Sequence, residues 1–111
     1  MPSRVATSVI FGFDFQAKAA IVLALENINN LQSLRLESNY EDIDITLFNG
    51  SHILAQAKSI TQPLIDFQNV RKNLKKALTS LSEGCTSLQQ NKIHCSTLIY
   101  ITNSRNPLNQ P

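Results

Sequence analysis

Cysteine is scarce in this chain of 111 residues, which has only Cys85 and Cys95. The two lack a Cys-x-x-Cys spacing and have no paired histidines nearby, so neither a disulfide framework nor a zinc site is indicated. We expect two reduced thiols. The sequence also lacks a secretory signal at its start and any apolar run of the about 18 residues that a bilayer span needs. These absences predict a soluble, cytoplasmic protein without a membrane partner.

Charged residues are also few, at 16% of the chain, and a formal net charge of +2 is too small to indicate nucleic-acid binding by itself. The two signs are nevertheless segregated along the chain. Four of the eight acids lie close together, namely Glu37, Glu41, Asp42 and Asp44. Four of the ten basic residues form a second group, namely Arg71, Lys72, Lys75 and Lys76. With 42% hydrophobic residues and no internal repeat, the chain fits one globular domain with a modest core.

Hydrophobic periodicity divides the first half of the chain. Asp14 is a good N-cap for a largely apolar first helix that ends at Asn29. Alternation of apolar and polar residues then predicts three strands, over residues 31–37, 42–48 and 52–58.

The second half predicts one more helix and one more strand. Pro63 is suited to a helix start, and apolar residues recur at three- and four-residue steps up to Gly84, the expected helix stop. A polar loop over 86–92 and a strand over 94–102 follow. The folded domain is expected to span 1–103. The polar, proline-containing residues 104–111 are expected to be a tail or linker toward a further domain of a larger parent protein.

Polar side chains occupy alternate positions of two predicted strands. Asp42 and Asp44 share one face of the second strand, and Gln56 and Lys58 share one face of the third. A buried strand rarely carries such groups without a function, because unpaired polar groups lose free energy on leaving water. Mg²⁺ takes oxygen ligands, which Asp42, the Gln56 carbonyl and a scissile phosphate would supply, and Glu37 on the neighbouring strand would add a carboxylate. Lys58 would orient water and stabilise transition-state charge, so the pattern predicts a nuclease-type site.

The element order, with an acid on the second strand and Gln-x-Lys on the third, resembles the core of the PD-(D/E)xK restriction-endonuclease-like superfamily. Segments 12–16, 36–37, 41–43 and 56–59 are similar to the N-terminal nuclease domain of bacterial antiphage effectors that cut double-stranded DNA. The resemblance implies an α/β fold with an αβββαβ core, in which helices flank a mixed four-stranded sheet. It also implies Mg²⁺, with Mn²⁺ as a substitute, a homo-oligomer, and a sensor or NTPase domain after the nuclease.

The resemblance assigns the catalytic roles to Glu37, Asp42, Gln56 and Lys58. The metal ligands among them are Glu37, Asp42 and Gln56. Gln16 on the first helix would border the site. Asp42 matches the family's Asp-Ile position, and Asp44 is the second candidate for its role. Gln56 occupies a position at which members of the superfamily most often have an acid. The glutamine lowers the negative charge of the set of metal ligands, which should weaken metal binding in the absence of DNA.

The hairpin between the second and third strands decides whether this site can form. A two-residue Asn-Gly loop would turn Asp42 and Asp44 away from Gln56. A three-residue loop over 48–50 places Asp42 opposite Gln56, whereas one over 49–51 places Asp44 there. The functional interpretation therefore predicts an odd loop or a bulge.

Each feature has an alternative interpretation. The acids of the second strand and the Gln-x-Lys of the third would also suit the solvated face of a one-sided sheet. The basic residues of segment 71–76 would either contact DNA phosphates or form a solvated helix face. The sequence favours a metal-dependent endodeoxyribonuclease domain of an antiphage effector, working as a dimer or larger assembly. The competing hypotheses are a catalytically inactive module of the same fold, used for DNA binding or assembly, and a plain α/β interaction domain.

Overall fold

The computed structural model describes residues 4–59 and 67–103. Its elements are α1 (Arg4–Glu26), β1 (Leu31–Leu36), β2 (Ile43–Leu47), β3 (His52–Lys58), α2 (Phe67–Gln90) and β4 (Cys95–Thr102). The order of helix, three strands, helix and strand is the order predicted from the sequence. The expected helix start at Pro63 and the expected tail over 104–111 lie outside the described residues.

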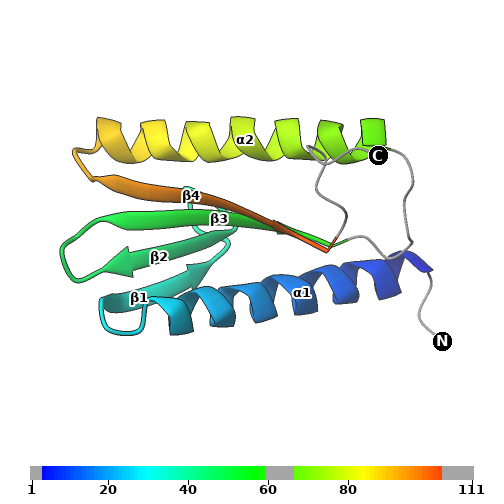
Figure 1. Ribbon diagram of the computed structural model, residues 1–111, viewed down its shortest axis with the longest axis horizontal. Coiled ribbons are helices and arrows are strands. Elements are labelled where there is room, and N and C mark those ends of the chain that lie inside the picture. The colour runs from blue at the N-terminus through cyan, green and yellow to red at the C-terminus, as the bar shows by residue number, and fades with distance from the viewer. Residues whose placement is uncertain (1–3, 60–66, 104–111) are drawn as a thin grey trace.

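Within the described residues, the four strands form one sheet in the order β1-β2-β3-β4. β1, β2 and β3 pair antiparallel, and β4 pairs parallel with β3 because α2 carries the chain back along the sheet. Figure 1 shows the sheet as a middle layer between the two helices. The fold is therefore α/β with a mixed four-stranded sheet covered by a helix on each face, as the sequence predicted at this level.

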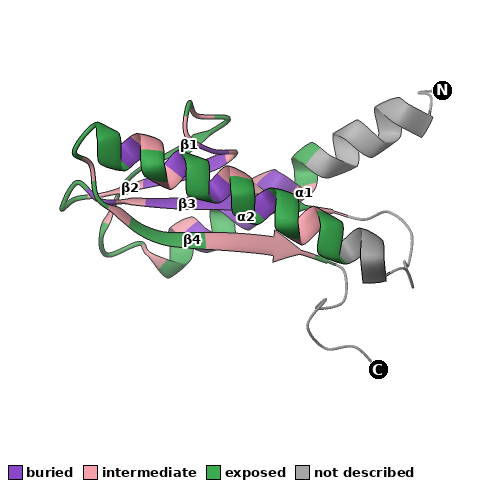
Figure 2. Ribbon diagram, turned by 90° about the horizontal axis from the view of Figure 1, so that it is seen from above, coloured by how far each residue is buried: buried purple, intermediate pink, exposed green. Residues whose placement is uncertain are grey.

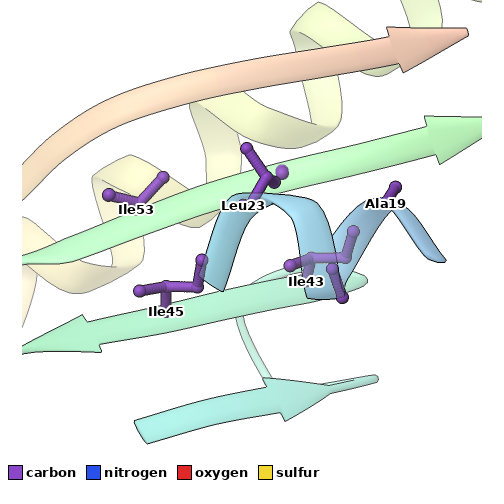
Figure 3. Close-up of a cluster of buried hydrophobic side chains, with 7 residues drawn as sticks. Ala19, Leu23, Ile43, Ile45 and Ile53 are labelled. Carbon is purple, nitrogen blue, oxygen red and sulfur yellow. The ribbon is translucent and has the colours of Figure 1, made fainter. Parts of the chain in front are cut away.

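Each face of the sheet packs against one helix. The α1 side holds the larger cluster, made of Ala19, Ala20, Leu23, Ile43, Ile45, Ile53 and Ala55 (Figure 3). On the opposite face, Leu54 packs with Leu81 and Leu88 of α2. Successive residues of β3 thus enter opposite cores, as strand geometry requires, and Figure 2 shows the buried part of this central strand. Even-numbered positions of β3, Gln56 and Lys58 included, belong to the α2 side.

The first helix begins earlier than predicted. Asp14 is an interior residue of α1 and not its N-cap, because the helix already starts at Arg4. The Asp14 carboxylate lies 2.8 Å from the Lys18 ammonium one turn later, an exposed pair at the spacing that stabilises helices. None of the described helices has the length and hydropathy of a membrane span.

The second helix ends later than predicted. Gly84 lies inside α2, so the expected stop there is wrong, and of the expected loop over 86–92 only residues 91–92 lie outside the helix. A Cβ atom on Gly84 would lie 2.4 Å from the backbone oxygen of Tyr40. The glycine therefore serves the close approach of α2 to the segment that precedes β2, and its place in the sequence does not mark a helix end.

Candidate functional site

The hairpin between β2 and β3 has a loop of three residues, 48–50. The Leu47 N–H donates to the Ser51 carbonyl at 2.9 Å, and the Gly50 N–H donates to the Leu47 carbonyl at 2.9 Å. Gly50 has a φ of +87°, which only glycine adopts without strain. A tight turn followed by a left-handed residue is a common three-residue hairpin, so the predicted odd loop is confirmed.

This loop sets the register that the functional hypothesis requires. Asp44 pairs with Leu54, and the ladder ends with the pair of Ile43 and Ala55, so Asp42, just before β2, and Gln56 come next at that end. On the other side of β2, the Glu37 N–H donates to the Asp42 carbonyl at 2.8 Å. Glu37, Asp42 and Gln56 therefore follow one another across the end of the sheet.

Gln16 links α1 to this row from the other face. Its side chain is only 8% exposed, and its Nε2 donates to Glu37 Oε1 at 3.1 Å and to the Asp42 carbonyl at 3.2 Å. Glu37 itself has a φ of +53°, so the chain turns sharply as it leaves β1. The structure thus brings Gln16 into contact with two of the residues that it was expected to border.

Glu41 is the residue of this site that sequence reasoning left without a role. The residue is 6% exposed, and its carboxylate accepts three hydrogen bonds. Oε1 accepts from Gln56 Nε2 and from the Asp42 N–H, both at 2.9 Å, and Oε2 accepts from Ser80 Oγ of α2 at 3.0 Å. Strand alternation would have put Glu41 on the face opposite Asp42. The turn that precedes β2 overrides that alternation, because the Ser38 N–H donates to the Glu41 carbonyl at 3.0 Å.

The three acids at this end of the sheet repel one another. The pKa of the half-buried Asp42 carboxyl is raised, first by loss of solvent and then by the charges of Glu37 and Glu41. The ionised form of Asp42 is therefore less favourable here than in water, and a nearby cation would favour it.

Asp44, the second candidate ligand, is engaged elsewhere. It is 5% exposed, and its Oδ1 lies 2.6 Å from Nδ1 of His52, diagonally across the β2–β3 ladder. The His52 ring in turn meets the Tyr40 ring edge to face, with centroids 6.1 Å apart. The sequence offered no partner for His52, and the structure supplies Asp44. Asp44 thus pairs with Leu54 and not with Gln56.

The basic residues lie on the α2 side of the sheet. Lys58 is the exposed last residue of β3 and shares the face of Gln56 by alternation. The four basic residues of α2 are all exposed, namely Arg71, Lys72, Lys75 and Lys76. Lys72 lies two helical turns before Ser80, and Lys76 lies one turn before it. Residues one turn apart lie on the same side of a helix, so both lysines share the side of α2 on which Ser80 contacts Glu41.

Protein-family models, curated proteins and solved structures were compared with the chain. No match was found.

The donor set can be tested against the metal that the resemblance implies. Within residues 4–59 and 67–103, no three histidine, cysteine, aspartate or glutamate side chains gather closely enough to enclose a metal ion. Mg²⁺ does not need such a cage, because it usually keeps several waters and takes one or two carboxylates. Asp42 and Glu37 offer those carboxylates, and Gln56 offers an amide oxygen. Oxygen donors of this kind are the ligands that Mg²⁺ or Mn²⁺ takes.

Proposed function

We propose that this chain is a metal-dependent endodeoxyribonuclease domain of the restriction-endonuclease-like type, which hydrolyses phosphodiester bonds of duplex DNA. The observation that supports the proposal is the register of the β2–β3 hairpin, which ends at the pair of Ile43 and Ala55 and so brings Asp42 and Gln56 to the same end of the ladder. A neighbouring Lys58 on the same face completes the set that the sequence resemblance requires. The antiphage effector role and the cytoplasmic location belong to the same proposal.

Each residue has a distinct task in this mechanism. Bound Mg²⁺, or Mn²⁺ in its place, would polarise the phosphate and lower the pKa of a bound water. Asp42 and Glu37 supply the anionic oxygens that hold the cation, and Gln56 supplies a neutral one. Lys58 places a permanent positive charge where the phosphate oxygens gain negative charge, and it orients the attacking water.

The four basic residues of α2 would hold the DNA backbone. Phosphate contacts by lysine and arginine are independent of sequence, and they position the duplex without selecting a base. The line from Lys72 through Lys76 to Ser80 leads to the acidic row, so a strand lying along it would reach the scissile position.

Assembly follows from the number of cutting centres. One chain offers one acidic row and therefore cuts one strand, so a double-strand break requires a second copy. We accordingly propose a homo-oligomer, activated through a C-terminal sensor or NTPase domain of the parent protein.

Plasmid cleavage tests the nuclease. The wild type and Lys58→Ala are incubated with supercoiled plasmid and Mg²⁺ or Mn²⁺, at protein concentrations that favour self-association, with EDTA as a control. We expect cleavage by the wild type only, abolished by EDTA. Lys18→Ala is the matched control, because it removes an exposed lysine from α1 and should leave cleavage unchanged. Equal cleavage by wild type and Lys58→Ala would contradict the proposed site.

One observation favours the inactive alternative. Gln56 supplies no negative charge at a position where an acid is commonest, which suits a module that binds DNA or assembles without cutting. That alternative expects DNA binding that is unaffected by EDTA, together with no cleavage at any concentration. Gel-shift measurements alongside the plasmid assay separate the two functions.

A further inference from the structure

The contact between Glu41 and Gln56 fixes which way the Gln56 amide points. An ionised carboxylate only accepts hydrogen bonds, so the group that meets it must be the amide nitrogen of Gln56. The 2.9 Å contact from Gln56 Nε2 to Glu41 Oε1 satisfies this requirement. The carbonyl oxygen of Gln56 is consequently directed away from Glu41.

The Glu41 carboxylate is itself held in place. The backbone N–H of Asp42 donates to the same Oε1, and the Ser80 hydroxyl donates to Oε2 at 3.0 Å. Both oxygens are therefore occupied, one by the chain entering β2 and the other by α2. Rotation of the carboxylate would break at least one of these bonds at a residue that is itself buried.

We propose that Glu41 is a positioning residue that holds the Gln56 side-chain oxygen toward a divalent cation, and that this role requires a glutamine at position 56. An acid at position 56 would bring two carboxylates to the 2.9 Å separation now bridged by an amide hydrogen. The family pattern would place a negative charge at position 56. Here Glu41 carries that charge, and it contacts the proposed ligand Gln56 and not the metal. The metal part of this inference rests on the proposed function, whereas the pairing of positions 41 and 56 does not.

Exchange of the two residues tests the inference. Glu41→Gln keeps the size of the side chain but adds an N–H donor, which lets the Gln56 amide turn over and present its nitrogen to the cation. Gln56→Glu places like charges side by side. The double variant E41Q/Q56E restores an amide-to-carboxylate contact with the two roles exchanged. Glu83→Gln is the matched control, since Glu83 is an exposed acid of α2.

Two readouts are needed, Mn²⁺ affinity by calorimetry and the melting temperature in EDTA. We expect Glu41→Gln to weaken Mn²⁺ binding by about tenfold or more, the usual effect of losing a residue that orients a ligand. Gln56→Glu should lower the melting temperature, and the double variant should recover both stability and Mn²⁺ binding. Glu83→Gln should change neither quantity.

The outcomes distinguish this inference from the proposed function. If the wild type binds Mn²⁺ and Glu41→Gln binds it equally well, Glu41 is not a positioning residue although the metal site stands. If the double variant recovers stability without Mn²⁺ binding, the pair is structural only and the inference is overturned. A wild type that binds no Mn²⁺, with or without duplex DNA, overturns the metal-dependent function together with the inference.

Discussion

The carboxyl group of Asp42 opposes folding when it is ionised. Its pKa is raised by burial and by the charges of Glu37 and Glu41, so the folded chain binds a proton there more readily than the unfolded chain does. The resulting stabilisation is complete below the unfolded-state pKa and is lost as the pH rises through the folded-state pKa. At neutral pH, the ionised Asp42 carboxylate therefore lowers the stability of the folded chain.

Replacement of Asp42 should consequently stabilise the metal-free protein. We expect Asp42→Asn to raise the melting temperature at pH 7.5 in EDTA by about 1–3 °C, a modest value because solvent screens a half-buried group. The gain should shrink as the pH falls toward the pKa of Asp42, and added Mn²⁺ should stabilise the wild type only. Differential scanning calorimetry measures both effects. Asp14→Asn on the exposed side of α1 is the control, and a lower melting temperature for Asp42→Asn would contradict the expectation.

Cys95 should be chemically inert. Burial raises the pKa of its thiol to about 12, with further contributions from the neighbouring Cys85 thiol and the Asp44 charge. Only about one Cys95 in ten thousand would be a thiolate at pH 8, and the thiolate is the reactive form. Mass spectrometry after iodoacetamide treatment should find Cys95 unmodified in the native protein and modified in urea. Rapid labelling of the native thiol would show that this pKa is not raised.

At the scale of elements, the close contact of α2 with the segment before β2 depends on Gly84. Alanine has the higher helix propensity by about 1 kcal/mol, which would favour Gly84→Ala in an isolated helix. Its Cβ, however, would lie 2.4 Å from the Tyr40 backbone oxygen, and backbone cannot move aside cheaply. We expect a net loss of about 1–2 kcal/mol in the free energy of unfolding, measured in urea. Ser82→Ala, exposed on the same helix, should not destabilise, and an equally stable Gly84→Ala would refute the packing argument.

The same glycine shows what the sequence can and cannot predict about the elements. Hydrophobic periodicity gave the element order and the bounds of β3, because alternating and helical patterns reflect which side chains are buried. The ends of both helices were mispredicted, since Asp14 and Gly84 suit helix termini by local preference and serve other contacts here. Tertiary contacts decide such positions, and a single sequence does not display them.

The sequence likewise predicted one part of the candidate site, the hairpin loop, and missed another, the contacts of Glu41. The loop length was limited in advance to an odd number by the requirement that acids and Gln-x-Lys share a face, and the structure selected residues 48–50. Glu41 escaped notice because its role depends on a turn before β2 and on Ser80, 39 residues further along the chain. Alternation describes residues inside strands, whereas the residues that orient a ligand often stand just outside them.

For the whole molecule, the basic face of α2 should make DNA binding depend on salt. Each phosphate contact contributes about −0.9 to the slope of log K against log salt. Removing two contacts with Lys72→Ala and Lys76→Ala should therefore make the slope shallower by about 1.8, as measured by fluorescence anisotropy with duplex DNA in EDTA. Lys18→Ala serves as the control for lost positive charge, because it lies on α1. An unchanged slope would assign the basic residues to a solvated helix face.

The register of the β2–β3 hairpin limits where this part of the chain can change in length during evolution. Exposed hairpin tips usually accept insertions and deletions of any length. A longer tip leaves Leu47 beside Ser51, whereas one residue added within β2 or β3 would shift the register and send Asp42 and Gln56 to opposite faces of the sheet. Natural variants that keep this site should therefore differ in length at the tip and not within the two strands.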